Sequence, residues 1–549
     1  MSDVKAPAPE YQFSGKQIAW GIVAIFMVYG TLSYWLQSLG IARPKMAADL
    51  DGMSLYAWSV SLPGLVSAFV TLIFGKLSDI YGRRIILLIA LVFNLIGNIL
   101  CALSPTFIFL IIASCIGAVG TGSMMPMVFA VVGDLFPPAK RSKWIGLLNI
   151  PTGLCSVFGP TLGGWVVDNL NWRYLWWFTL PLLLICLVTV PIGVPSIVNP
   201  GARRKIDVLG CILVAIASST TIIGFSLAGT AYPWASAPIL LLFGISLVFW
   251  VFFFRAEYRV EEPILDPAVL RNRSFNTVAL ASFLSFIGQM GMLMYFPMFL
   301  QGVQGISATR SGLIITPFSV LMAFIGVPVG FLLARSKRFK WMYILGFGIL
   351  TVDMFGLIFF NAETPAIWAV MTATLAGIGL GAIPTVNTLV VQNAVPKRLL
   401  GVAMGAIFFC LMMGVAISPA LLGSAMRATY MSTIKSSLPS ELKRIADTAT
   451  LEALGNDRVL LSQPAMLQLE NTIRQKSPDG ERLFRQTVDA IRNSMQAGLR
   501  AVFWLGAVTM LIAFLIICTV PPTSVSAEEQ EMQALRPLPE TNDSTAGFP

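Results

Sequence analysis

Residues 75–84 read Gly75-Lys76-Leu77-Ser78-Asp79-Ile80-Tyr81-Gly82-Arg83-Arg84, a charged stretch between two long apolar runs. The runs cover residues 55–74 and 85–103. Each is about 20 residues long, which is the length that an α-helix needs to cross the ~30 Å hydrocarbon core of a bilayer. We therefore expect a tight turn at the membrane surface, and its three Lys and Arg residues predict that it faces the cytoplasm.

Two features of this stretch favour close helix packing and a local ion pair. Gly75 and Gly82 let two helices approach, and let the backbone turn, where a Cβ atom would obstruct. Asp79 and Arg83 are four residues apart, so their side chains can pair if this part of the chain is helical. A basic loop that only orients the protein in the membrane is the alternative interpretation.

The order of these residues also resembles the loop between helices 2 and 3 of the major facilitator superfamily of secondary transporters. The resemblance implies that Asp79 and Arg83, with an acid at the cytoplasmic end of helix 4, form a charge cluster that latches an outward-facing state. Asp134, in Val132-Gly133-Asp134-Leu135-Phe136-Pro137, lies where that acid is expected. The predicted conformational latch consists of Gly75, Asp79, Gly82, Arg83, Arg84 and Asp134.

The composition is that of a polytopic, all-α membrane protein. The 549 residues are 56% hydrophobic and 12% charged, with a mean hydropathy of +0.77, whereas soluble domains carry about 25% charged residues. The apolar runs are continuous rather than alternating, which favours helices over a β-barrel. The chain has no histidine, which excludes a histidine metal site, a Ser-His-Asp triad and a histidine proton relay.

The sequence predicts neither an enzyme nor a bound cofactor or metal, because no nucleotide-binding loop, metal cluster or triad is recognisable. A proton gradient is the expected energy source. The seven cysteines fall in apolar runs and are expected to be packing residues. The net charge of +10 comes mostly from short loops that orient the helices, so no nucleic-acid partner is expected.

We expect fourteen transmembrane helices, an even number that places both termini on one side. Nineteen Lys and Arg residues lie in the loops of one side and four in the short loops of the other. Positive charge is enriched in cytoplasmic loops, so both termini are predicted to be cytoplasmic. The predicted location is the plasma (inner) membrane, crossed many times.

The two halves of the chain repeat. Glycine and proline positions recur at a constant offset of 259, as Pro137, Gly146, Pro160 and Gly164 and again as Pro396, Gly405, Pro419 and Gly423. The repeat predicts two pseudo-symmetric six-helix bundles. With the resemblance stated above it implies a major facilitator fold, and we expect a monomer. The predicted parts are a cytoplasmic tail (1–17), an N-terminal bundle (18–195), an inserted helix pair (207–255), a C-terminal bundle (276–520) and a disordered cytoplasmic tail (521–549).

The inserted pair resembles the fourteen-helix branch of the drug:proton antiporters. A second resemblance is to a Gly-Pro motif that marks exporters of this superfamily, carried here by Gly153, Gly159, Pro160, Gly163 and Gly164. Gly159 and Gly163 form a small-xxx-small face for a neighbouring helix, and Pro160 bends the helix. A generic glycine packing face is the alternative.

The chain departs from this branch at the residues that usually couple protons and bind substrate. The first span, Ile18–Ile41, has no acid, residues 112–117 contain no Arg, and a helix 13 position that is often Arg falls near Cys410. One acid lies deep in a later span, Asp353, where a charge costs about 2.5–3.5 kcal/mol on insertion scales. It is the proton-coupling candidate, and a structural acid bonded to a neighbour is the alternative.

Other polar residues within spans are candidates for a substrate cavity: Tyr34, Trp35, Gln37, Asn149, Gln289, Tyr295 and Asn387. Each could instead form an interhelical hydrogen bond. Methionines in helices 4 and 9 suit a promiscuous apolar pocket, although packing against lipid explains them equally. The expected substrate is a small hydrophobic or amphiphilic compound.

Residues 426–498 are a long polar stretch of mixed charge, placed outside the membrane. Phe484, Val488, Ile491 and Met495 form a helical stripe, and we expect two or three amphipathic helices here. They could cap an outer vestibule or dock a periplasmic or extracellular partner. A tolerated insertion is the alternative.

Together these features predict a secondary active transporter that exports hydrophobic, drug-like compounds by alternating access in exchange for protons. Two alternatives remain open. One is a lipid or hydrophobic-metabolite exporter with weak or no proton coupling, which the missing polar residues favour. The other is a non-transporting membrane receptor or assembly protein that uses the outer stretch.

Overall fold

The computed structural model describes residues 14–51, 55–196, 207–229, 232–260, 263–336, 339–396, 399–445, 463–476 and 479–520. The predicted C-terminal tail and nearly all of the N-terminal tail lie outside these ranges. The described chain is helical, and its one β-bridge, between Ala228 and Tyr232, is isolated.

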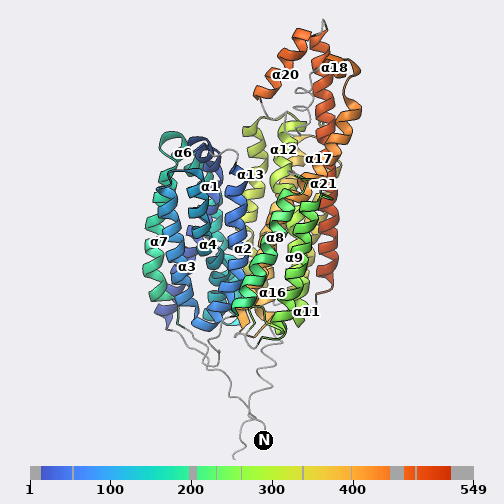
Figure 1. Cartoon of the computed structure of the whole chain (residues 1–549). Helices are drawn as coiled ribbons and strands as arrows, with labels where there is room; N and C mark the ends of the chain where they lie inside the picture. The colour runs from blue at the N-terminus through green and yellow to red at the C-terminus, as the bar shows by residue number, and fades with distance from the viewer. Residues whose placement is uncertain are drawn as a thin grey trace, which may run out of the picture.

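The first seven helices form one bundle, drawn from blue to teal in Figure 1. They are α1 (Gly15–Asp49), α2 (Tyr56–Tyr81), α3 (Arg83–Ala102), α4 (Phe107–Leu135), α5 (Pro138–Leu147), α6 (Asn149–Asn169) and α7 (Arg173–Gly193). Within it α3 packs on α4 and α7, and α1 packs on α6 and α7. Several of these helices end at glycines or prolines, or continue through an internal proline, as membrane helices can.

The second bundle follows a short helix, α10 (Pro267–Arg271), and is drawn in green to red. Its first span is α11 (Arg273–Met290), continued by η2 (Gly291–Tyr295), α12 (Phe296–Met298) and η3 (Phe299–Val303). The next are α13 (Ala308–Phe324), α14 (Gly326–Ser336), α15 (Lys340–Ile358), α16 (Ala366–Ala394), α17 (Leu400–Ser437) and α21 (Gly480–Cys518). The two π-helical turns, η2 and η3, interrupt a regular helix, and such turns occur often at functional sites.

The inserted pair is α8 (Val208–Leu227) and α9 (Ala237–Glu257). These two helices pack on each other, and α8 also contacts α2 of the first bundle and α17 of the second. Figure 1 shows the pair in front of the line where the bundles meet. The insertion therefore bridges both bundles instead of extending one of them.

Thirteen helices of the described structure are long and apolar enough to cross a membrane. Their outer surfaces carry large apolar side chains, such as Leu247 and Val352, which are 67% and 70% exposed. An apolar surface of this extent is favourable in contact with lipid and unfavourable in contact with water. The remaining span of the fourteen predicted is α6, which is 21 residues long but rich in glycine and packs on α1 and α13.

Two helices project beyond the bundles at the top of Figure 1. The helix α17 continues unbroken past Met426, because Met426, Tyr430 and Ile434 follow at every fourth position and stay buried. The helix α21 begins far above the membrane spans, at Gly480. The predicted outer stretch is thus largely an extension of these two helices, with α18 (Ser440–Ile445) and α20 (Gln463–Lys476) beside them and residues 446–462 outside the described part.

Candidate functional site: the junction of the two bundles

The stretch 75–84 is almost entirely helical, and only Gly82 forms the turn. The helix α2 ends at Tyr81 and α3 begins at Arg83. Gly82 has φ +91°, a conformation that residues with a Cβ rarely adopt. The expectation of a ten-residue surface turn was too wide, because the residues before Gly82 stay helical, with Ser78 buried and Lys76 and Asp79 partly buried.

Arg83 is the centre of a buried charge cluster at this end of the molecule. Its Nη2 lies 2.5 Å from Asp79 Oδ1, its Nε lies 3.0 Å from Asp134 Oδ2, and its Nη1 donates to Ser78 Oγ. The side chains of Arg83 and Asp79 are 6% and 8% exposed. One guanidinium therefore joins the ends of α2, α3 and α4 through Asp79 and Asp134. Arg84 is half-buried at the next position of α3.

Asp79 also binds the second bundle. Its Oδ1 accepts a hydrogen bond from Gly401 N (3.0 Å), and its Oδ2 accepts one from Val402 N (2.7 Å). These are the first-turn amides of α17, whose own N-cap residue, Leu399, offers no side-chain cap. A carboxylate at a helix N-terminus satisfies free N–H groups and interacts favourably with the helix dipole. Asp79 thus caps a helix that begins 321 positions later in the chain.

Glycines make this contact close enough to form. A Cβ atom at Gly75 would lie 2.6 Å from the Gly401 carbonyl oxygen and 3.0 Å from the Gly405 Cα. A Cβ at Gly401 would collide with Arg83 and with Asp79. We call the end of the molecule that carries this cluster the latch end.

A second close contact joins the bundles at the same end, and sequence reasoning did not assign it. A Cβ atom at Gly146 of α5 would lie 2.6 Å from the Gly326 carbonyl oxygen and 3.0 Å from the Gly330 Cα, both in α14. Beside it, Asn149 Nδ2 donates to Thr385 Oγ1 at 3.3 Å. The internal repeat could have indicated this contact, since Gly146 and Gly405 are related by the offset of 259. The two contacts, α2 with α17 and α5 with α14, are a pseudo-symmetric pair.

The exporter motif lies partly at the junction. Gly153 of α6 faces α13 of the other bundle, where a Cβ atom would meet the Phe324 ring at 2.8 Å. Gly159 and Gly163 are buried. The backbones of Pro160 and Gly164 belong to α6, but the surroundings of these two residues lie outside the described part.

Four of the cavity candidates form side-chain hydrogen bonds with described residues. Asn387 Nδ2 donates to Ser282 Oγ, Tyr295 Oη to the Pro419 carbonyl at 3.3 Å, and Gln289 Nε2 to Ser285 Oγ at 3.4 Å. These bonds join helices, or turns of one helix, within the second bundle. Asn149 reaches across the junction to Thr385. Tyr34 is half-buried in α1, and the side chains of Trp35 and Gln37 lie outside the described part.

Asp353 is buried within the second bundle. It is 2% exposed, and neither of its carboxyl oxygens has a hydrogen-bond partner among the described residues. Its neighbour Val352 faces the opposite, lipid side. The helix α15 packs on α16 and α21, and Thr351 donates to the Met510 carbonyl of α21 at 3.3 Å. The acid therefore sits inside one bundle, as the cost of burying it predicts, and not at the junction.

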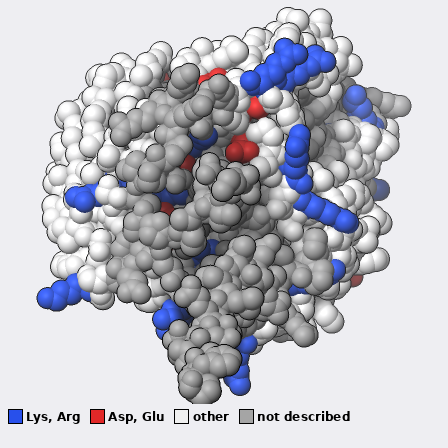
Figure 2. All heavy atoms as spheres, turned by 90° about the horizontal axis from the view of Figure 1, so that it is seen from below, with Lys and Arg blue, Asp and Glu red and all other residues white. Residues whose placement is uncertain are grey.

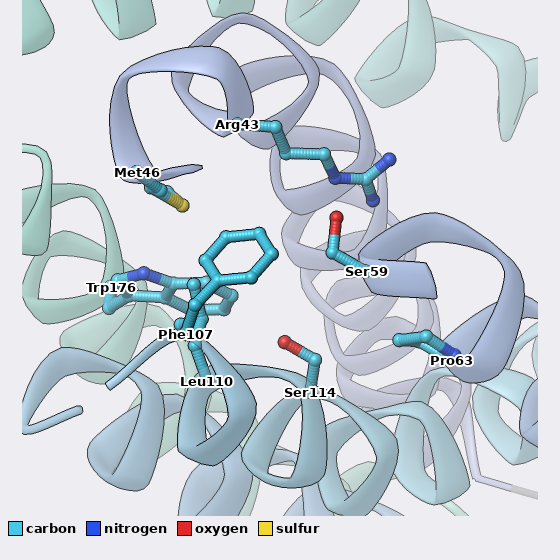
Figure 3. A pocket seen from close by; sticks show the side chains of 8 residues that line it. All are labelled: Arg43, Met46, Ser59, Pro63, Phe107, Leu110, Ser114 and Trp176. Carbon is cyan, nitrogen blue, oxygen red and sulfur yellow. The ribbon is translucent and has the colours of Figure 1, made fainter. Parts of the chain in front are cut away.

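One pocket opens at the end opposite the latch. It is lined by one cation, two serines and apolar side chains from α1, α2, α4 and α7, namely Arg43, Met46, Ser59, Pro63, Phe107, Leu110, Ser114 and Trp176. Figure 3 shows the Phe107 ring in its centre and the Arg43 guanidinium near Ser59. It holds about 400 Å³ of empty space, open solvent included. None of the predicted cavity residues whose side chains are described lines it.

The family model described as Major Facilitator Superfamily matches residues 18–419. The chain is 28% identical over 509 residues to the multidrug transporter protein MdtP of Bacillus subtilis, covering 90% of this chain and 91% of that protein. It is 26% identical over 507 residues to multidrug resistance protein 3 of Bacillus subtilis, covering 92% and 96%.

Two solved structures have a similar fold. One is the human organic anion transporter MFSD10, with a TM-score of 0.60 and 14% identity, covering 91% of this chain and 99% of that one. The other is the proton:xylose symporter XylE, with a TM-score of 0.59 and 14% identity, covering 93% and 98%. At this identity the likeness shows the fold alone.

Proposed function

Since the chain belongs to the major facilitator superfamily, we propose that it exports hydrophobic, drug-like compounds by alternating access and in exchange for protons. It is a multi-pass membrane transporter and not an enzyme. The names of its relatives, two multidrug proteins and a lincomycin resistance protein, support drug export. The proposed substrate is a small hydrophobic or amphiphilic molecule.

The observation that carries the proposal is the capped helix at the latch end. Asp79 belongs to the first bundle and binds the first amides of α17 in the second, and Arg83 holds Asp79 in place. Such a contact exists only while the two bundles are closed at this end. Alternating access requires a contact of this kind, which forms in one state and breaks in the other.

We assign the latch end to the cytoplasm of a cell bounded by its plasma membrane. Figure 2 looks onto this end, where Lys and Arg side chains are spread over the face outside the grey region and acidic atoms show at few places. Cytoplasmic loops are enriched in Lys and Arg. The closed state described here then faces outward, and both termini lie inside.

Asp353 is the group that we propose to carry the proton. We propose that transport needs no bound cofactor. Asp353 is buried, and its two carboxyl oxygens have no hydrogen-bond partner among the described residues, which favours a carboxyl group that exchanges a proton over one that stays ionised. A membrane potential of 100 mV supplies about 2.3 kcal/mol for each proton that enters.

A second candidate function is export of a lipid or hydrophobic metabolite without proton coupling. One observation favours it, because α1 holds no acid between Ile18 and Ile41 and residues 112–117 of α4 hold no cation. Both positions carry the coupling residues in the branch that the chain resembles.

Proton movement in proteoliposomes separates these functions. Vesicles with an acidic lumen and a trapped pH dye receive hydrophobic cations, neutral compounds or lysolipids, and vesicles without protein are the control. Substrate-triggered alkalinisation of the lumen is the expected result. Labelled substrate that crosses without any pH change would establish the uncoupled exporter, and a failure of every compound to cross would contradict both transport functions.

A further inference from the structure

Two buried acids lie side by side at the latch end of the inserted helix pair. Asp207 precedes α8 and caps it, since its Oδ1 accepts a hydrogen bond from Gly210 N at 2.8 Å. Glu257 is the last residue of α9, and its Oε2 accepts one from Leu265 N at 2.8 Å. They are 8% and 1% exposed, so more than nine-tenths of each residue is buried.

The second oxygen of each acid is also buried but has no hydrogen-bond partner among the described residues. These atoms are Asp207 Oδ2 and Glu257 Oε1. Both point to the same place, because a Cβ atom built on Gly210 would contact both of them, Oε1 at 2.8 Å. The absence of a side chain at Gly210 thus leaves room for two carboxyl groups to converge.

Among the described residues, a cation and a thiol interact with the pair. Lys76 of α2 is close enough to attract Glu257, and the Cys211 thiol interacts with both acids. No group of three metal-binding side chains occurs in the described structure. A bound cation needs more oxygen ligands than two carboxyl groups with one free oxygen each provide.

We propose that Asp207 and Glu257 share one proton, held between Asp207 Oδ2 and Glu257 Oε1. Two carboxylates in contact inside a protein do not both ionise, because their repulsion adds to the cost of burying each charge. One proton turns one oxygen into a donor and leaves the other as its acceptor. A single hydrogen bond then satisfies the two atoms that have no other hydrogen-bond partner among the described residues.

This proton-binding pair is linked to the latch through α2. Lys76, which interacts with Glu257, is three residues before Asp79, and α8 packs on both α2 and α17. On the other inserted helix, the Trp250 ring lies 5.9 Å from the Phe409 ring of α17. When α2 and α17 separate, Lys76 moves relative to the acids. Opening of the latch therefore changes the affinity of the pair for its proton, and by reciprocity loss of the proton changes the stability of the latch.

Infrared difference spectroscopy tests the pair directly, and it depends on neither the substrate nor transport. The purified full-length chain in nanodiscs is titrated from neutral to alkaline pH while the carbonyl stretch of protonated carboxyl groups is recorded. The wild type is expected to lose one such signal that belongs to the pair. Glu257→Gln and Asp207→Asn are each expected to remove that signal near neutral pH, and the double variant is expected to remove nothing more.

Two controls make the result decisive. Asp353→Asn removes a different buried acid and is expected to leave the signal of the pair unchanged. Size-exclusion profiles identify any variant that fails to fold. Such a variant is replaced by Gly210→Ala, which places a methyl group between the two acids. Gly210→Ala is expected to split the shared signal into two. Separate, additive signals from the two acids would overturn the proposal. A signal that disappears when sodium replaces choline would also overturn it, in favour of a cation site.

Discussion

At the scale of single residues, the latch depends on the shape of the Arg83 side chain as much as on its charge. Its guanidinium contacts Asp79, Asp134 and Ser78 through three different nitrogens. A lysine ammonium is a single point charge on a flexible chain and cannot reproduce this fork. Removing one partner of a buried ion pair lowers stability by about 3–5 kcal/mol, because the remaining charge stays buried without its partner.

Arg83→Ala and Arg83→Lys are therefore both expected to open the latch end. In a chain whose seven native cysteines are replaced by alanine, Thr385→Cys reports on the junction between the bundles. Alkylation of this cysteine is expected to speed up by about tenfold or more in both variants. The matched control is Arg485→Ala, which breaks an exposed pair with Glu481 and should change nothing. Unchanged alkylation in Arg83→Ala would refute the latch.

Asp353→Asn keeps the size of the side chain and removes its ability to exchange a proton. We expect the variant to move substrate down its own gradient but to lose stimulation by a pH gradient. Counterflow of labelled substrate, measured with and without the gradient, checks both statements. Asp49→Asn, an exposed acid that pairs with Lys45, is the control and should retain the stimulation. Full stimulation in Asp353→Asn would assign the acid a structural role.

The residues of the latch were predictable, and their partner was not. Asp79 and Arg83 are one helical turn apart, so a local rule pairs them, and family resemblance placed Asp134 beside them. The bonds from Gly401 and Val402 to Asp79 join residues 322 and 323 positions apart. No local pattern encodes such a contact, because it depends on how the two bundles meet.

At the scale of helices, the junction is made by glycine faces on crossing pairs. The helix α2 meets α17 at Gly75, and α5 meets α14 at Gly146, with backbone atoms in direct approach. The charge cluster lies at the first contact. The pseudo-symmetric contact has Asn393 where the first has Asp134, by the offset of 259, so the two contacts differ in charge at this position.

Gly75→Ala is expected to hinder closure, because its methyl group would lie 2.6 Å from the Gly401 carbonyl oxygen. Overpacking of this kind destabilises the closed contact by about 1–3 kcal/mol. The rate of alkylation of Thr385→Cys should therefore rise by about tenfold. The matched control lies in the same helix, since a Cβ atom at Gly64 would meet nothing within 4 Å. If Gly64→Ala and Gly75→Ala behave alike, close approach at Gly75 does not limit closure.

The lengths of most helices could be predicted from the apolar runs of the sequence, but the residues at which the helices end could not. Residues 75–81 are polar enough to suggest a surface turn, yet they remain in α2 because Asp79 and Ser78 find buried partners. The helix α17 continues to Ser437 through a polar sequence, because every fourth residue still packs on α21. In both places tertiary contacts override the composition of the segment.

At the scale of the whole molecule, the two bundles are joined at the latch end by contacts on both sides of the junction. Transport by alternating access requires these contacts to separate in every cycle. A cross-link between the bundles should therefore stop transport while leaving each bundle folded. The pair Asn149 and Thr385 is well placed, because Asn149 Nδ2 and Thr385 Oγ1 are 3.3 Å apart.

Asn149→Cys combined with Thr385→Cys, in the chain without other cysteines, is expected to lose substrate flux when a short bis-methanethiosulfonate reagent is added. Flux should return after reduction, which shows that the protein was locked and not damaged. Each single variant treated with the same reagent is the control and should keep its flux. Undiminished flux in the cross-linked double variant would contradict alternating access at this junction.

The helix α17 has a mechanical consequence for the whole protein. It is 38 residues long, about 57 Å, contains Pro419, and runs from the amides held by Asp79 to the region of α18 and α20 at the opposite end of the molecule. The continuous helix links these two ends, and Pro419 is the point at which it can bend. A nanobody that binds the projecting parts of α17 and α21 is therefore expected to restrict the separation of α17 from α2, and so to inhibit transport without entering the substrate path.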